Sequence, residues 1–138
     1  MAERNICLDT SALIAFLKGR DPGAAAVEKA VKECSCFVTA ITVYELRFGV
    51  ARAAKQIGED ELLGAMGILA LDGLAAGRAA TLHDSLIRRN LDIGIKDVLI
   101  AAICLAHKMP LLSLNERHFS RVAGLTVATP VAFLAQTK

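Results

Sequence analysis

The feature that most constrains the fold is an abrupt change at Asp9, where a short apolar run gives way to hydroxyl residues and then to a helical pattern. Ile6-Cys7-Leu8 indicates a short buried strand. Asp9, Thr10 and Ser11 are residue types that accept hydrogen bonds from the free N–H groups at a helix start. A strand leading straight into a helix is half of a βαβ unit, and ligands of open α/β sheets gather at the carboxyl ends of such strands. We therefore expect Asp9 at the mouth of a crevice.

The same alternation of short apolar strands and helices continues along the chain. Further strands are predicted at 36–38, 68–71, 111–114 and 125–127, and helices at 10–18, 24–33, 42–54, 59–66, 74–90 and 98–107. Alternating strands and helices are typical of a parallel sheet with helices on both faces. We therefore predict an α/β fold, with one domain over residues 1–138 built on a short parallel sheet.

Composition narrows the functional classes. Hydrophobic residues make up 54% of the chain and aromatic residues 4%, and no apolar run approaches the roughly 18 residues that a membrane span needs. The first residues lack a signal-peptide pattern, so we expect a cytoplasmic protein without a membrane segment. The formal net charge of +2 is too even to indicate nucleic-acid binding by itself.

The four cysteines do not form a metal-binding pattern. Cys7 and Cys104 lie in apolar runs and are expected to be small core residues. Cys34 and Cys36 are separated by one residue, whereas zinc sites typically separate paired cysteines by two to four. A structural or incidental role is predicted for all four, without a disulfide framework.

Two further acids and one amide are predicted at the same edge of the sheet as Asp9. Glu45 lies near the start of the helix after the second strand, Asp97 opens the helix after a glycine-containing loop, and Asn115 follows a late strand. Right-handed βα connections would bring these positions to one edge. Each of the three acids has a structural alternative: Glu45 would complete a capping box with Thr42, and Asp9 and Asp97 would be helix-start acids.

Three carboxylates held close together raise one another's pKa values unless a cation neutralises them. Mg²⁺ and Mn²⁺ are hard ions that take oxygen ligands and keep waters for a phosphate substrate. Such a site can activate water against a phosphodiester. The histidines His83, His107 and His118 show no zinc-like spacing, and neither a glycine-rich phosphate loop nor a Gly-x-Ser-x-Gly turn is present. Metal-dependent phosphodiester hydrolysis is the leading interpretation.

Four segments together resemble PIN-domain ribonucleases of the VapC toxin type. They are 6–14, which reads ICLDTSALI; 41–49, which reads ITVYELRFG; 93–102, which reads IGIKDVLIAA; and 112–119, which reads LSLNERHF. Their order and spacing cover essentially the whole chain. The resemblance implies a PIN-like α/β domain, a pocket that binds Mg²⁺ or Mn²⁺, endonucleolytic cleavage of RNA, and neutralisation by a cognate antitoxin in a type II toxin–antitoxin pair.

Carried over position by position, the resemblance implies that Asp9 and Asp97 are metal ligands. Glu45 completes the acidic cluster, either as a ligand or by orienting the attacking water. Ser11 and Ser113 are supporting hydroxyls, with Ser113 standing where the family often has Thr.

Asn115 departs from the family pattern, which often has a fourth acid there. An amide can position a water or hold an aspartate but adds no charge, so one metal or two stays open, with Glu116 a possible substitute. Two other classes remain as alternatives: a non-catalytic PIN-fold module that binds RNA or protein, and a haloacid-dehalogenase-like phosphatase. The phosphatase chemistry needs a second Asp two residues after Asp9, where this chain has Ser11.

The partners expected from the resemblance are RNA, an antitoxin and a second copy in a homodimer. Arg47 is the first candidate for RNA contact, followed by Lys96 and Arg117. Because the chain has no Trp and only Tyr44, we expect recognition through phosphates and RNA shape more than through base stacking. One apolar set either belongs to the core or forms a groove for an antitoxin helix: Leu13, Phe16, Leu17 and Phe48.

Overall fold

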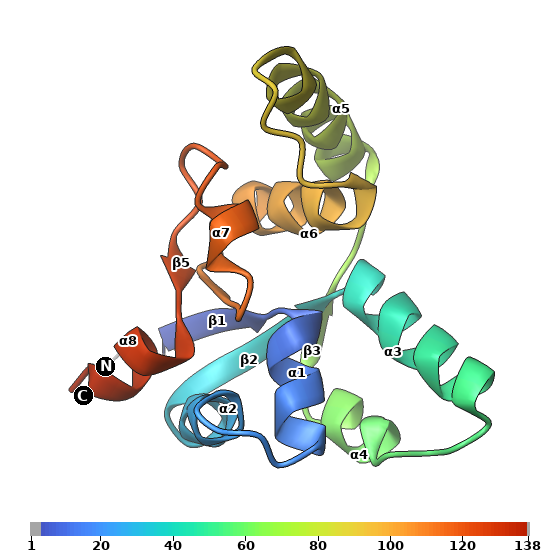
Figure 1. Ribbon diagram of the computed structural model, residues 1–138, viewed down its shortest axis with the longest axis vertical. Helices are drawn as coiled ribbons and strands as arrows, with labels where there is room; N and C mark the ends of the chain where they lie inside the picture. Colours follow the sequence, from blue (N-terminus) through green and yellow to red (C-terminus); the bar gives the residue numbers. More distant parts are fainter. Residues whose placement is uncertain (1–3, 138) are drawn as a thin grey trace.

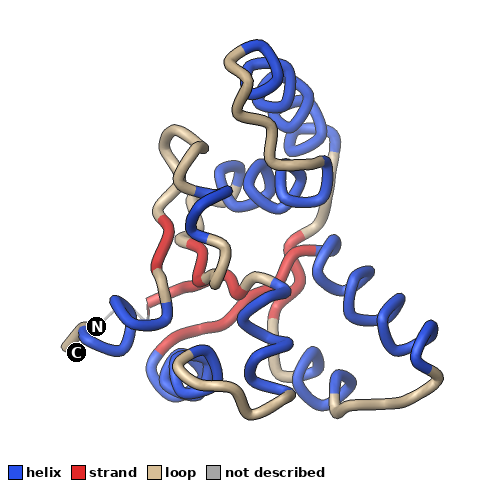
Figure 2. The backbone as a smooth tube through the Cα atoms, in the orientation of Figure 1, coloured by secondary structure: helices blue, strands red, loops and turns tan. Residues whose placement is uncertain are grey.

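A five-stranded parallel sheet forms the centre of the molecule (Figures 1 and 2). The computed structural model describes residues 4–137. The strand order is β3-β2-β1-β4-β5, so β1 lies in the middle. The strands are β1 (Arg4–Leu8), β2 (Cys34–Thr39), β3 (Gly67–Leu69), β4 (Leu111–Leu112) and β5 (Val127–Ala128). The predicted single α/β domain with a short parallel sheet is confirmed.

Helices cover both faces of this sheet. They are α1 (Thr10–Leu17), α2 (Gly23–Glu33), α3 (Ala40–Ala53), α4 (Glu59–Gly64), α5 (Gly73–Arg88), α6 (Ile95–Ala106), α7 (Glu116–Phe119) and α8 (Pro130–Ala135). Figure 1 shows α5 and α6 on one side of the sheet and α1, α2 and α4 on the other. No helix in the described range 4–137 combines the length and apolarity that crossing a bilayer requires.

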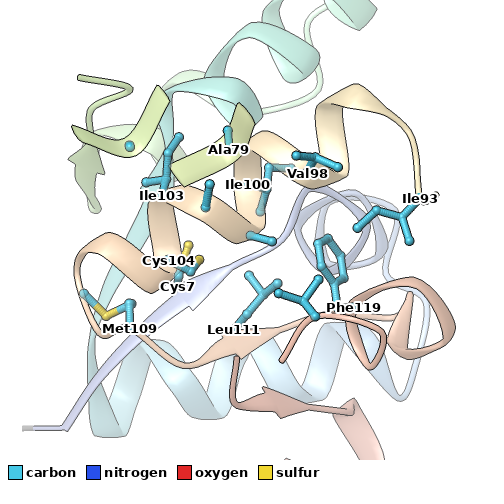
Figure 3. Close-up of a cluster of buried hydrophobic side chains, with 14 of the residues drawn as sticks. Cys7, Ala79, Ile93, Val98, Ile100, Ile103, Cys104, Met109, Leu111 and Phe119 are labelled. Atoms are coloured by element: carbon cyan, nitrogen blue, oxygen red, sulfur yellow. The ribbon is translucent and has the colours of Figure 1, made fainter. Parts of the chain in front are cut away.

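Two hydrophobic cores follow from the alternation of side chains along β1. Cys7 and Leu111 face the core under α5, α6 and α7 (Figure 3), whereas Ile6 and Leu8 face the core under α1, α2 and α8. Successive side chains of a strand point to opposite faces, so a strand that is buried on both sides is apolar throughout. This explains why the run that ends at Asp9 is continuously hydrophobic.

All four cysteines are free thiols, in agreement with the prediction. Cys7 and Cys104 are fully buried and lie next to each other in the core (Figure 3). The hydrogen bond between the Cys7 and Cys104 thiols, together with burial, raises the pKa of Cys7 well above its usual value. Burial raises the pKa of Cys36 to about 11. Thiols that resist ionisation in this way are weak nucleophiles and weak metal ligands.

Helices α1 and α2 approach each other closely at Gly23. A methyl group at this position would lie 2.7 Å from the Cβ atom of Ala15, so Gly23→Ala should push the two helices apart. We expect the free energy of unfolding to fall by about 1–3 kcal/mol, the usual range for overpacking. Gly77→Ala is the matched control, because its added methyl group meets nothing within 4 Å. In the interior of α5 it should stabilise by up to about 1 kcal/mol. Urea unfolding measures the free energy of unfolding of both variants. If the two substitutions changed it equally, the close contact at Gly23 would be contradicted.

Candidate active site

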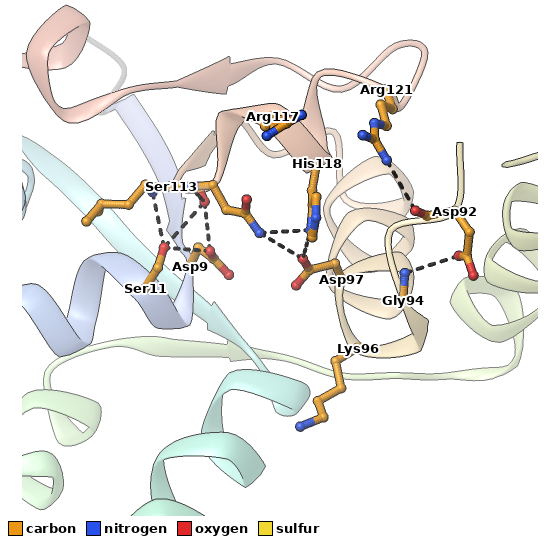
Figure 4. Close-up of polar contacts among 12 residues, drawn as sticks. Asp9, Ser11, Asp92, Gly94, Lys96, Asp97, Ser113, Arg117, His118 and Arg121 are labelled. Atoms are coloured by element: carbon orange, nitrogen blue, oxygen red, sulfur yellow. Dashed lines mark hydrogen bonds and ion pairs between the residues drawn. The ribbon is translucent and has the colours of Figure 1, made fainter. Parts of the chain in front are cut away.

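Asp9 lies between the end of β1 and the start of α1, and its carboxylate is buried. The residue is only 4% exposed. It occupies the N-cap position of α1, but its side chain makes no capping hydrogen bond. Instead one oxygen, Oδ2, accepts hydrogen bonds from Ser11 Oγ at 2.8 Å and from Ser113 Oγ at 2.7 Å (Figure 4). The helix-cap alternative therefore does not explain this carboxylate.

The two serines are themselves fixed by backbone donors. The N–H of Leu114 donates to Ser11 Oγ at 3.1 Å, and the N–H of Asn115 donates to Ser113 Oγ at 2.8 Å. Strand β4 ends at Leu112, two residues earlier than predicted, and the chain then turns so that Ser113 reaches Asp9. The structure thus places Ser11 and Ser113 beside Asp9, where supporting hydroxyls were predicted.

Glu45 reaches the same edge from α3. The helix begins at Ala40 with Thr39 as its N-cap, whose hydroxyl accepts from the N–H of Thr42. Glu45 is therefore in the second turn, and the capping-box alternative with Thr42 is wrong. Its Oε1 atom accepts a 2.7 Å hydrogen bond from Thr10 Oγ1, and its Oε2 atom lies 3.9 Å from Lys96 Nζ. Since Thr10 follows Asp9 in the chain, this hydrogen bond ties the second acid to the first.

Asp97 is held by two nitrogen donors from the segment after β4. Its Oδ2 atom lies 3.1 Å from Asn115 Nδ2 and 2.9 Å from His118 Nδ1 (Figure 4). The two nitrogens are 2.9 Å apart. A carboxylate oxygen readily accepts two hydrogen bonds, so we assign both nitrogens as donors to Oδ2, with a proton on Nδ1 of His118. Asn115 therefore holds an aspartate, one of the two roles predicted for an amide there.

The electrostatics of the site centre on Asp9. Burial raises the pKa of Asp9, the hydrogen bonds from Ser113 and Ser11 oppose that rise, and the charge of Asp97 adds to it. Among residues 4–137, no cationic side chain lies within ion-pair distance of Asp9. A buried carboxylate without a cationic partner is costly to ionise. The site is therefore suited to binding a positive charge.

Asp9, Glu45, Asp97 and Asn115 thus lie in one hydrogen-bonded neighbourhood. Within the described part of the chain, however, no three His, Cys, Asp or Glu side chains come close enough to form a finished metal site. Glu45 is turned toward Thr10, and Asp97 toward Asn115 and His118. The acids lie at one edge of the sheet, as predicted, but in the described structure their carboxylates do not converge on a common point.

Sequence reasoning missed Thr10 and His118 as members of this network. His118 was considered only as a zinc ligand, although its position three residues after Asn115 brings both side chains to one side of the short helix α7. Thr10 was considered only as a helix-start residue. The sequence did contain a signal in each case: Thr10 is a polar residue next to Asp9, and His118 is a polar residue about one helical turn after Asn115.

The three cations predicted to contact RNA differ in their surroundings. Arg47 forms ion pairs with Asp60 and Glu59 of α4, so its charge is already compensated. Lys96 is 57% exposed and lies near Glu45. Arg117 is exposed on α7 beside His118 (Figure 4) and has no ion-pair partner in the described residues. Lys96 and Arg117 are therefore better placed for RNA than Arg47, and all three roles stay predictions.

Substituting Asn115 by Asp tests the neutral character of this position. The change would place a second carboxylate beside Asp97 Oδ2, at the site of the present 3.1 Å hydrogen bond. Repulsion between two charges at this distance is worth about 1–4 kcal/mol near a protein surface. We expect a lower melting temperature in chelator, with a smaller loss for Asn115→Ala, which removes the donor without adding charge. An Asn115→Asp variant as stable as the parent would show that the amide does not hold Asp97.

Comparison with known proteins identifies the fold family. A family model described as PIN domain matches residues 6–125. The chain belongs to the PIN domain family. A solved structure similar to this PIN domain is VapBC2 of Rickettsia felis bound to a DNA fragment from its promoter, with a TM-score of 0.79, 25% identity, and coverage of 91% of this chain and 98% of that one. VapBC-1 of nontypeable Haemophilus influenzae gives a TM-score of 0.78 at 20% identity, over 92% of this chain and 98% of that one.

Two curated relatives match part of the PIN domain. Ribonuclease VapC of Rickettsia bellii is 38% identical over 50 residues, and ribonuclease VapC1 of Rickettsia felis is 40% identical over 50 residues. Each match spans 36% of this chain and 37% of the relative. The similarity therefore covers little more than a third of either curated protein.

Proposed function

We propose that this PIN domain is a metal-dependent endoribonuclease and the toxin of a type II toxin–antitoxin pair. The observation that carries the proposal is the buried, uncompensated Asp9, linked through Thr10 to Glu45 and through Ser113 and Asn115 to Asp97. The similarity to proteins named ribonuclease VapC and to VapBC structures supports it.

The donor set fits Mg²⁺ or Mn²⁺, because it consists of carboxylate oxygens and includes the buried Asp9, which has no cationic partner in the described residues. Asp9 and Asp97 would hold the ion, and Glu45 would be a ligand or would orient the attacking water. When bound, such an ion lowers the pKa of the attacking water and neutralises charge that builds on the phosphodiester.

The residues around the acids fix which oxygens are available. Ser11 and Ser113 both donate to Oδ2 of Asp9, and Asn115 and His118 both donate to Oδ2 of Asp97. In the described structure the other oxygen of each aspartate accepts no side-chain hydrogen bond that would compete with an ion. Such outer hydrogen bonds orient ligands and are worth roughly ten- to a hundredfold in metal affinity.

The predicted antitoxin surface is wrong, because it included the buried residue Leu13. Leu13 is fully buried in the core under α1, whereas Phe48 is 52% exposed on α3, so these residues do not form one face with Phe16 and Leu17. An apolar groove of about 250 Å³ lies instead between α1, α3 and the segment around Ile57. We place the antitoxin segment there, since Glu45 lines the groove and an occupant would lie beside the acids. A homodimer is also proposed, without a surface assigned to it.

Chelation tests the proposed function directly. Cleavage of a fluorogenic RNA should stop in EDTA and return when Mg²⁺ or Mn²⁺ is added in excess. Asp97→Asn should reduce the rate at saturating metal, and should also shift the metal concentration needed for half-maximal rate upward. RNA binding without cleavage at any metal concentration would favour the non-catalytic alternative.

A further inference from the structure

Two exposed aromatic rings lie on α3 beside the candidate site. The rings of Tyr44 and Phe48 are stacked, with centroids 5.7 Å apart and planes inclined by 15°. Tyr44 is 54% exposed and Phe48 52% exposed. Large exposed aromatic side chains next to each other are unusual on a surface that has no partner. We therefore expect the two rings to contact a binding partner that presents a flat, apolar surface.

A positive charge continues the same face of the helix. Arg52 is four residues beyond Phe48, so Tyr44, Phe48 and Arg52 follow one another at successive i, i+4 positions. We call these three residues the α3 stripe. At 1.5 Å per residue it is about 12 Å long. Arg52 has no acidic side chain within ion-pair distance among residues 4–137, in contrast to Arg47, which two acids neutralise. The stripe therefore combines stacking surface with an uncompensated cation.

The stripe starts at the acidic neighbourhood. Tyr44 immediately precedes Glu45, whose carboxylate accepts from Thr10 next to Asp9. Figure 1 shows α3 beginning at the edge of the sheet where β2 ends and running outward from there. A strand of nucleic acid leaving the candidate site along α3 would meet the aromatic pair first and Arg52 next.

We propose that the α3 stripe binds single-stranded RNA, with an unpaired base on the Tyr44–Phe48 pair and a phosphate on Arg52. The inference rests on the proposed ribonuclease function and specifies its substrate: the RNA is unpaired beside the cleaved bond. Every base has a flat face, so stacking is tolerant of sequence. Because the two rings already order each other, little side-chain freedom is lost on binding. Stacking thus joins the phosphate and shape recognition expected from sequence.

Tyr44 provides its own spectroscopic probe. It is the only tyrosine of the chain, and the chain has no tryptophan, so tyrosine emission reports on this residue alone. The protein carries Asp9→Asn to prevent cleavage. A uridine 12-mer RNA should quench the emission, whereas an abasic oligonucleotide of equal length and charge should not. N-acetyltyrosinamide at the same absorbance corrects for light absorbed by the RNA.

Affinity measurements with substitutions complete the test. In the same Asp9→Asn background, Tyr44→Leu with Phe48→Leu should weaken binding of the 12-mer about five- to 150-fold, which corresponds to the roughly 1–3 kcal/mol of a stacked base. Affinity for a blunt RNA duplex should stay unchanged, since its bases are not accessible. Arg52→Ala should weaken binding and lower the slope of log affinity against log salt by about one. Val131→Ala with Leu134→Ala, exposed apolar residues on α8, is the control and should have no effect.

Three outcomes would overturn the assignment: equal quenching by the abasic strand, unchanged affinity of the leucine double variant, or loss only of self-association in sedimentation velocity. The last would make the stripe a contact between copies. If the protein with Asp9 cleaves RNA while the stripe variants bind normally, the inference fails and the proposed function stands. If the protein neither binds nor cleaves any RNA, both fail.

Discussion

Replacing Asp9 by Asn is expected to abolish RNA cleavage and, in chelator, to raise the melting temperature. The carboxylate is buried, and neighbouring charge from Asp97 adds to the cost of ionising it. The amide has the same shape and its oxygen still accepts from Ser11 and Ser113. Loss of an outer partner of a metal ligand already reduces affinity or activity up to about a hundredfold, so loss of a ligand should reduce cleavage by at least about that factor.

The stability gain should depend on pH in a defined direction. Burial raises the pKa of Asp9 in the folded state, so the folded protein keeps this proton to a higher pH than the unfolded chain does. Below about pH 4, where both states hold the proton, the parent and Asp9→Asn should melt alike. As the pH rises, the unfolded chain ionises first, and the parent loses stability relative to the variant until Asp9 ionises in the folded state as well.

Asp92→Asn is the matched control, because the pKa of Asp92 is shifted in the opposite direction to that of Asp9. Its pKa is lowered, first by a hydrogen bond from the Gly94 N–H and also by His83, so its charged form favours folding. Neutralising it should lower the melting temperature at neutral pH. Differential scanning calorimetry in EDTA compares the two variants. A lower melting temperature for Asp9→Asn at neutral pH would show that the carboxylate is not strained by burial.

Phe119→Ala is expected to give the largest loss of stability among the single substitutions considered. The ring is fully buried in the core between α6 and α7 (Figure 3). Truncating such a side chain typically costs about 3–5 kcal/mol, a large part of the roughly 5–15 kcal/mol that stabilises an ordinary domain. Because Phe119 directly follows His118, the cavity should also loosen the contact between His118 and Asp97.

Urea unfolding measures this loss, and Val131→Ala is the control. Val131 is 66% exposed, so its truncation should change the free energy of unfolding by less than about 0.5 kcal/mol. The effect on the site is measured separately, as the Mn²⁺ affinity of folded Phe119→Ala at low temperature. Stability equal to that of the parent would mean that α7 is not anchored through this ring.

The general fold could be predicted from sequence because its signals are local. The apolar run before Asp9 and the all-apolar helix around Ile100 each specify an element and its burial, and the alternation of elements then specifies a parallel sheet. The common location of Asp9 and Glu45 followed from one rule on the direction of βα connections, which does not apply to Asp97 because α6 follows α5 and not a strand. That rule needs no side-chain detail, which is why it succeeded.

Predictions that depended on side-chain choice were less successful. Two threonines three residues apart, Thr39 and Thr42, could each begin α3, and Thr39 does so because β2 continues to that residue. Leu13 and Phe48 were treated as one apolar set, yet Leu13 belongs to the core beside α2 and Phe48 is exposed. Arg47 lies close to Glu45 in sequence, but ion pairs with α4 compensate its charge. Competing partners from other elements decided these cases, and a local pattern contains no information about them.

The central position of β1 has a consequence for synthesis on the ribosome. Its partner β4 is more than a hundred residues away, with Cys7 opposite Leu111, and the N–H of Asp9 donates to the carbonyl of Leu112. A nascent chain therefore cannot complete the surroundings of Asp9 until the segment from Leu111 to Ser113 has emerged from the exit tunnel. The proposed cleavage therefore requires a chain synthesised at least through Ser113, and a fragment that ends before this residue should be inactive.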